Sequence, residues 1–199
     1  TESFSYSEYW PVVEEIVEHM SIDQKIGHMT LVPIQMLYDV DGSFNPELIK
    51  TYHLGAVFNA ASEAPDGKGG VSSSTFNASN FAYATMENYQ ALTAQLNTQM
   101  VNIRWNKEGK QKTVQIPILL GTDAIHGNQH VLGSVLFPHN IGFAATHNPT
   151  LLALSAYFTA RNTLKSGCNW IFSPATNIAF NYQWGRTYET MGTRYDDVI

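Results

Sequence analysis

Short apolar runs alternate with helix-like stretches along this chain of 199 residues, and this alternation constrains the fold more than any other feature. Four runs have the length and composition of buried strands, at residues 31–34, 54–58, 116–120 and 170–172. Helical spacing or helix-start signals occur at residues 10–19, 22–29, 46–52, 86–101 and 149–165. Strands that alternate with helices predict βα units arranged around a parallel sheet.

The number of predicted strands indicates what fraction of an eight-stranded barrel this chain could form. An eight-stranded (β/α)8 barrel needs roughly 250 residues. About four βα units therefore predict an α/β fold that is the first half of a (β/α)8 TIM-type barrel, with the chain ending before the barrel closes. Residues 1–199 are expected to be the amino-terminal part of one such barrel, and residues 195–199 to begin another helix. An open doubly wound sheet is the alternative, although no nucleotide-binding glycine motif supports it.

Local signals place several boundaries and loops. Ser21 and Gln24 have the spacing of a capping box, which predicts a helix start. Asn148 followed by Pro149 predicts another, and Gly167 is expected to end that helix. Residues 59–80 are predicted to be a long loop, and the basic run 104–112 a solvated loop with a polar turn.

Composition excludes several classes of function. The formal net charge of -6 argues against a nucleic-acid partner. No apolar run approaches the ~20 residues needed to span a bilayer, so no membrane partner is expected. Cys168 is the only cysteine, which excludes an intramolecular disulfide and leaves a buried, inert thiol as the expected role. The sequon at Asn77 permits secretion, and the compartment stays open.

Two polar motifs follow the third and fourth predicted strands. The first, Gly121-Thr-Asp-Ala-Ile-His-Gly127, places Asp123 where a strand ends, which is the ligand-binding end of a parallel barrel. An Asx turn that caps the following loop is the alternative role for this carboxylate. The second motif, Trp184-Gly-Arg-Thr-Tyr-Glu189, carries Arg186, whose guanidinium can hold sugar oxygens or form a surface ion pair.

These motifs, with Leu136-Phe-Pro-His-Asn-Ile-Gly142 between them, resemble the amino-terminal barrel of family 3 glycoside hydrolases of the β-glucosidase and exo-glucanase type. The resemblance runs from about residue 20 to residue 199. One departure lies after Glu189, where the family continues with a Ser-Glu-Asp-Pro-like turn and this chain reads Met191-Gly-Thr-Arg-Tyr-Asp-Asp197.

The resemblance implies a retaining hydrolase that removes terminal non-reducing β-D-glucosyl residues from β-glucosides or β-glucans without a cofactor or metal. It assigns Asp123 and Arg186 to substrate binding, and it implies a supporting role for Glu189. His126 is expected to hold the loop after the strand by a backbone hydrogen bond, and His139 to act similarly. The nucleophile and the acid/base are expected outside these 199 residues, so the chain needs the rest of its barrel, in the same or another polypeptide.

Two other functions stay open at the level of sequence. A carbohydrate-binding or assembly component without the catalytic pair of carboxylates would keep the same sugar subsite. A metal-dependent hydrolase would use the histidines His126, His130, His139 and His147. Gly127 and Gly133 argue against one continuous helix through the first two, and no H-E-x-x-H motif is present.

Overall fold

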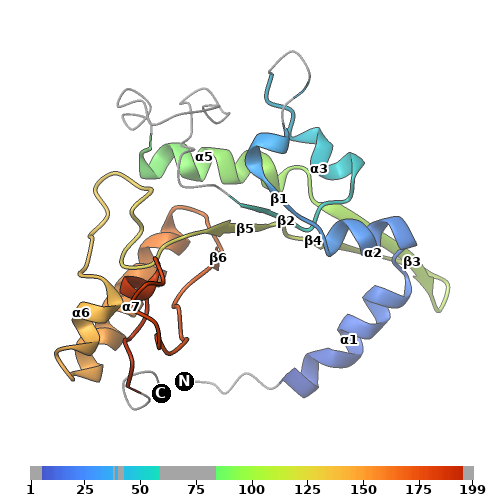
Figure 1. The fold of residues 1–199 in the computed structure, drawn as a ribbon. Coiled ribbons are helices and arrows are strands. Elements are labelled where there is room, and N and C mark those ends of the chain that lie inside the picture. The colour runs from blue at the N-terminus through green and yellow to red at the C-terminus, as the bar shows by residue number, and fades with distance from the viewer. Residues whose placement is uncertain (1–5, 38, 40–42, 59–83, 195–199) are drawn as a thin grey trace. The chain divides into compact units, whose positions relative to one another are not determined.

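A computed structural model describes residues 6–37, 39, 43–58 and 84–194 of the chain (Figure 1). The chain divides into two compact units. The first comprises residues 1–57 and 95–119, and the second residues 58–94 and 120–199. No helix among the described residues is long and apolar enough to span a bilayer.

The first unit opens with helices α1 (Tyr6–Glu18) and α2 (Ile22–His28) and strand β1 (Leu31–Pro33). The 3-10 helix η1 (Ile34–Leu37), helix α3 (Glu47–Thr51) and strand β2 (Ala56–Phe58) follow, with β2 ending at the unit boundary. Strands β1 and β2 are neighbours. The predicted capping box is confirmed, since Gln24 N donates to Ser21 Oγ and the Gln24 side chain accepts from Ser21 N.

A close backbone approach joins α2 to β2. Gly55 N donates to Gly27 O at 3.0 Å, and both glycines lie where a side chain has no room. A Cβ on Gly27 would overlap the carbonyl oxygens of Tyr52 and His53, and one on Gly55 would overlap the backbone of His28.

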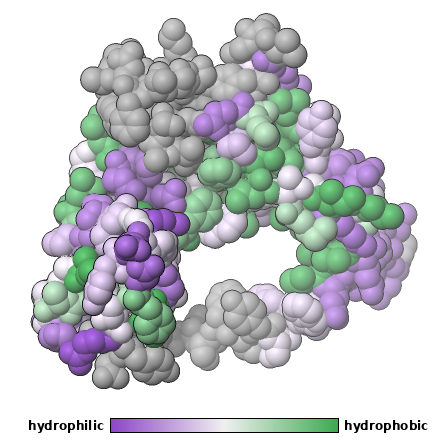
Figure 2. Space-filling model, in the orientation of Figure 1, coloured by the Kyte–Doolittle hydropathy of each residue, from purple (hydrophilic) through white to green (hydrophobic). Residues whose placement is uncertain are grey.

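Apolar side chains of α2 and its C-cap are exposed: Ile22, Ile26 and Met29 lie at the surface (green in the region of α2 in Figure 2).

The basic run 104–112 is a β-hairpin, so the prediction of a solvated loop was wrong. Strands β3 (Val101–Lys107) and β4 (Lys110–Ile116) pair antiparallel along their full length. Glu108 and Gly109 form the two-residue turn with φ of 52° and 73°, the positive values that a tight hairpin turn requires. The hairpin buries Val101 and Ile103 with Met20, which lies just beyond α1, because alternate residues of a strand share a face.

The second unit holds the segments that carry the two polar motifs. Strand β5 (Leu119–Thr122) begins at the boundary, and from Leu120 on it belongs to this unit, where it pairs in parallel with β6 (Trp170–Ile171). Between them lie α6 (Asn140–Ala144) and α7 (Pro149–Lys165), and the 3-10 helix η2 (Thr187–Glu189) follows β6 (Figure 1). Helix α5 (Met86–Asn97) begins in this unit.

Helix α7 is the clearest confirmation of a sequence signal. Asn148 Oδ1 accepts hydrogen bonds from Thr150 N and Leu151 N, and Pro149 occupies the first turn. The helix ends at Lys165, and Gly167 has φ of +93° just beyond it.

The cysteine lies three residues after the end of this helix. Cys168 is 2% exposed, and burial raises the pKa of its thiol. A thiol that is buried and held in its protonated form is a weak nucleophile, as expected for an inert cysteine.

Other boundaries moved from their predicted positions. The third predicted strand, 116–120, lies at 119–122, and the helix predicted at 86–101 ends at Asn97, before the hairpin begins at Val101. The short elements η1, α6 and η2 were not predicted, since three to five residues are too few for a periodic pattern. The predictions for residues 59–80, with the sequon at Asn77, and for residues 195–199 fall outside the described residues.

The structure therefore confirms an α/β fold with a parallel pairing of strands. The barrel and the single-domain organisation stay predictions.

Candidate sugar-binding site

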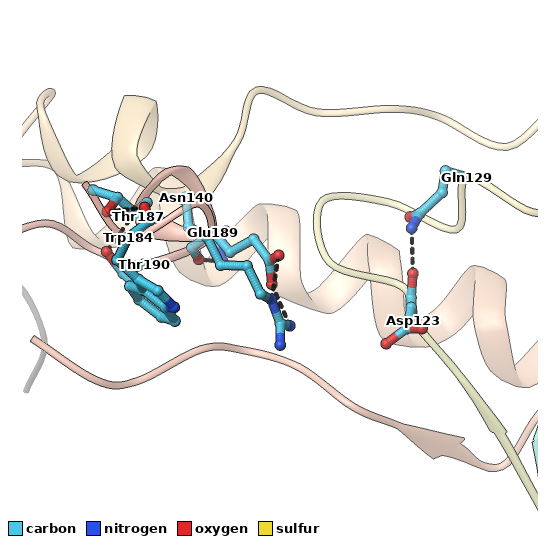
Figure 3. A network of polar contacts seen from close by, with 8 residues as sticks. Asp123, Gln129, Asn140, Trp184, Thr187, Glu189 and Thr190 are labelled. Carbon is cyan, nitrogen blue, oxygen red and sulfur yellow. Dashed lines mark hydrogen bonds and ion pairs between the residues drawn. The ribbon is translucent and has the colours of Figure 1, made fainter. Parts of the chain in front are cut away.

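Asp123 directly follows β5 and is fixed through its backbone. Its carbonyl oxygen accepts a hydrogen bond from Gln129 Nε2, and the carbonyl of the next residue, Ala124, accepts one from Ser173 Oγ at 2.8 Å. Figure 3 shows the Asp123 side chain pointing away from Gln129. Within the described residues the carboxylate has no hydrogen-bond partner, so the Asx turn is not formed by them.

The loop after Asp123 is closed by His126. Its Nδ1 lies 2.6 Å from Phe137 O, and Phe137 N donates to His126 O at 2.7 Å. Gly127 has φ of +108°, and a Cβ there would overlap Val135 O, so the loop closes this tightly only with glycine. The predicted supporting geometry of His126, a backbone hydrogen bond, is present.

Arg186 and Glu189 form a bidentate ion pair in which the two members differ in exposure. Arg186 Nε lies 2.7 Å from Glu189 Oε1, and Nη2 lies 2.7 Å from Oε2. The Arg186 side chain is 61% exposed and that of Glu189 only 6%. Parallel charge-assisted bonds of this kind fix the plane of the guanidinium. Glu189 thus holds Arg186 in place while leaving its other N–H groups accessible.

The turn that carries Arg186 is rigid because its hydroxyls bond to its own backbone (Figure 3). Thr187 Oγ1 donates to Trp184 O at 2.7 Å, and Thr190 Oγ1 donates to Thr187 O at 2.8 Å. Asn140, at the start of α6, donates from Nδ2 to Glu189 O at 3.0 Å. This buried amide joins the Phe-Pro-His-Asn motif to the Arg186 turn.

Electrostatics connects the two predicted sugar-binding residues. The hydrogen bonds and charge of Glu189 raise the pKa of the Arg186 guanidinium, and the negative charge of Asp123 acts in the same direction. The structure therefore places the Asp123 carboxylate and the Arg186 guanidinium within each other's field, in one unit, although they lie far apart in the sequence.

His130 and His139 are the histidines with shifted pKa values. Burial lowers the pKa of His130, which is 8% exposed, and the charge and backbone carbonyl of Asp123 oppose that shift. Burial and then His126 lower the pKa of His139, and Glu189 opposes them. Imidazoles shielded from water favour the neutral form because a low-dielectric environment penalises charge.

The ring of His139 does not act as predicted. Its Nδ1 is buried and has no hydrogen-bond partner among the described residues, so the predicted backbone bond is not made by this atom. The ring instead packs against His126, with centroids 4.0 Å apart, and against Tyr188 at 4.7 Å. Sequence reasoning also missed Tyr188 and Asn140, although both lie within the motifs that it singled out.

The histidines that suggested a metal-dependent hydrolase are arranged differently from a metal centre. Among the residues that the structure describes, no group of three or more His, Cys, Asp or Glu side chains could hold a metal ion. The rings of His126 and His139 pack against each other, and Nδ1 of His126 is already within hydrogen-bond distance of Phe137 O.

Comparison with known proteins matches residues 21–198 to the glycosyl hydrolase family 3 N terminal domain. A lysosomal beta glucosidase of Dictyostelium discoideum is 29% identical over 185 residues, which are 90% of this chain and 20% of that protein. The crystal structure of a mutant exo-1,3/1,4-beta-glucanase from a Pseudoalteromonas species is 29% identical, with a TM-score of 0.58, over 91% of this chain and 25% of that one.

A mutant beta-glucosidase from Listeria innocua, solved with laminaribiose, matches 98% of this chain and 22% of its own with a TM-score of 0.58. Its identity of 15% makes it a likeness of fold alone. The chain spans about a fifth to a quarter of these relatives. Because the family match covers most of the sequence, the chain belongs to glycoside hydrolase family 3, within the N-terminal domain of that family.

Proposed function

We propose that this chain supplies part of the sugar-binding subsite of an enzyme that removes terminal β-D-glucosyl residues from β-glucosides or β-glucans with retention. The observation that carries the proposal is that one unit holds both an unbonded carboxylate, Asp123, and an accessible guanidinium, Arg186, whose plane Glu189 fixes. A β-glucosidase-like relative and a glucanase at 29% identity support the substrate class.

The two groups have complementary chemistry toward a sugar. A carboxylate accepts strong hydrogen bonds from hydroxyl groups, and an ionised acceptor makes them stronger than a neutral one. The guanidinium of Arg186 keeps N–H donors beyond the two that Glu189 occupies, and it donates to the oxygens of the same ring. Both groups are positioned before substrate arrives, which lowers the entropic cost of orienting it.

The architecture that we propose is the first half of a (β/α)8 barrel, with residues 1–199 in a single barrel domain. Strands β1, β2, β5 and β6 would be its first four strands, and the hairpin β3–β4 an insertion before the third. The motif residues then follow the carboxyl ends of β5 and β6, where barrel enzymes bind their ligands. The TM-score of 0.58 over 91% of the chain supports this arrangement.

Retaining hydrolysis needs two carboxyl groups roughly 5–5.5 Å apart, one as nucleophile and one as acid and then base. Glu189 is committed to Arg186, and Asp123 is assigned to sugar hydroxyls, so neither takes these roles. The family resemblance implies that the nucleophile and the acid/base lie outside these 199 residues. A β-linked substrate and the remaining barrel, in the same or another chain, are the partners implied.

The test is hydrolysis of 4-nitrophenyl β-D-glucopyranoside by the natural polypeptide that contains these residues. Asp123→Ala should lower kcat/KM by ~10²-fold or more, because contacts that strengthen in the transition state are lost. Arg186→Ala should act in the same direction. Asp23→Ala, in the first turn of α2, and Arg104→Ala, on the hairpin, are matched controls and should leave turnover unchanged.

Retained turnover in Asp123→Ala would contradict the assignment. A natural polypeptide that binds β-glucosides without hydrolysing them would instead favour the carbohydrate-binding component as its function. The anomer released first, followed by NMR, checks the stereochemistry: a retaining enzyme releases β-glucose before mutarotation.

A further inference from the structure

Three aromatic rings from separate segments of the second unit lie against one another. His126 comes from the loop after β5, His139 directly precedes α6, and Tyr188 belongs to η2. The centroids of His126 and His139 are 4.0 Å apart at an interplanar angle of 42°, and those of His139 and Tyr188 are 4.7 Å apart at 80°. We call these three residues the ring stack.

Each end of the ring stack is close in sequence to one of the two proposed sugar-binding residues. His126 is three residues after Asp123, in the loop that its own contact with Phe137 O closes. Tyr188 lies between Arg186 and Glu189 in the rigid turn. The central ring, His139, adjoins Asn140, which donates to Glu189 O. The stack thus connects the backbone that carries the carboxylate to the backbone that carries the guanidinium.

We propose that His139 is a positioning residue that sets the separation of Asp123 and Arg186 by packing between His126 and Tyr188. This inference rests on the proposed function, because it concerns the same subsite. His139 acts through its ring and not through a hydrogen bond of Nδ1, since that atom is buried without a partner among the described residues. Ring packing at these centroid distances is favourable and directional.

The groups that face His139 make the stack dependent on its neutral form. The ring contacts His126 and Tyr188, and Glu189 belongs to the same turn as Tyr188. Burial and His126 lower the pKa of His139, whereas the charge of Glu189 raises it by less. A proton on His139 would be partly shielded from water and would face a second imidazole, so acid should loosen the stack and weaken sugar binding.

The experiment compares two variants of His139 in the natural polypeptide. His139→Phe keeps a ring of similar shape and removes the ionisable group, and the lost Nδ1 leaves no described partner unbonded. His139→Ala removes the ring. At neutral pH the alanine variant should lose about 10–10²-fold in kcat/KM, because a small displacement of a positioned group costs that much. The phenylalanine variant should recover most of this loss.

The pH profile separates positioning from a structural role. In His139→Phe the fall of kcat/KM on the acid side should begin at a lower pH than in the natural protein. The reason is that the variant lacks the His139 imidazole, which must be neutral for the stack to form. If His139 only stabilised the fold, its replacement would not shift this acid-side fall, provided that the folded variant is compared with the folded natural protein. Equal losses in the two variants, or an acid limb that does not move, would overturn the inference.

The second pair, Tyr188→Ala and Tyr188→Phe, tests the other end of the stack if His139→Ala does not fold. Tyr188 is 45% exposed, so its truncation should leave the fold intact. The alanine variant should lose about tenfold or more in kcat/KM, and the phenylalanine variant should retain most of it. Unchanged kcat/KM in Tyr188→Ala would contradict the proposal.

The Asp123→Ala and Arg186→Ala variants keep this inference distinct from the proposed function. If both retain activity, the subsite itself is wrongly assigned. If both lose activity while His139→Ala is folded and fully active, the subsite stands and only the role of the ring stack is refuted.

Discussion

Lys107 of the hairpin β3–β4 forms an ion pair with Glu15 of α1, and Arg186 forms one with Glu189 in its own turn; the two pairs differ in geometry and exposure. Lys107 Nζ lies 2.8 Å from Glu15, with both side chains open to water at 49% and 29% exposure. In the Arg186–Glu189 pair the carboxylate is 6% exposed and bonded to both arms of the guanidinium. The Glu189 carboxylate is therefore shielded from water much more than that of Glu15, whereas both cations stay open to water.

The surroundings of the two pairs differ in the same way. The hairpin has a regular register of seven residue pairs and a small apolar cluster beneath it. The site loops have few regular hydrogen bonds of that kind, and they bury Asn140, Glu189 and Thr190. A regular element that buries apolar side chains stabilises the molecule, whereas irregular segments that bury polar ones hold particular groups in place. The comparison predicts that mutations in the two regions affect different measurements.

The largest effect is expected on stability, from the hairpin. Ile103 is 1% exposed, and Ile103→Ala should lower the free energy of unfolding by about 2–5 kcal/mol, because a buried side chain is replaced by a cavity. The kcat/KM of the folded fraction should not change. Urea unfolding followed by circular dichroism measures the first quantity, and steady-state kinetics normalised by an active-site titration measures the second. Arg104→Ala, at the adjacent exposed position, is the control.

A mutation in the site should lower kcat/KM rather than stability. Glu189→Ala frees the Arg186 guanidinium from its fixed plane, and we expect kcat/KM to fall by about 10–10²-fold. Glu15→Ala removes the acidic partner of the hairpin pair and should leave kcat/KM unchanged. Steady-state kinetics of the two variants tests this difference. If both variants lose kcat/KM equally, the two regions do not differ in their effect on turnover.

The smallest expected effect is a pH dependence of stability that belongs to the site region. The folded pKa values of His130 and His139 are lowered, so folding favours their neutral forms. Their contribution is fully present above the ordinary value of 6.5 and is lost as the pH falls below it, while the unfolded chain takes up protons.

The hairpin region responds in a different pH range. The hydrogen bond from Lys107 lowers the pKa of Glu15, so the stability that this carboxylate contributes is lost only below its ordinary value of 4.5. Between 6.5 and 4.5 the urea midpoint should therefore fall because of the histidines, and less so in His130→Gln. A midpoint that stays constant across this interval would contradict the assignment.

Much of the fold follows from local signals. The capping box at Ser21 and the start of α7 at Asn148 depend on residues within one helical turn, and both formed as predicted. The hairpin was missed although Val101, Ile103 and Trp105 alternate with polar residues. Its turn uses Glu108-Gly109 rather than the Asn-Gly or Asp-Gly that signals a tight turn most strongly, and its polar face resembles a loop.

The family motifs, the order of most helices and strands in the described part of the chain, and the candidates could all be predicted from sequence patterns. These candidates are Asp123, Arg186, Glu189 and His126. Packing in three dimensions was needed to show that the partner of Arg186 is buried, that Asn140 supports the turn, and that His139 packs between His126 and Tyr188. Periodicity and capping record interactions between near neighbours in the chain, whereas contacts between segments some fifty residues apart depend on how those segments pack.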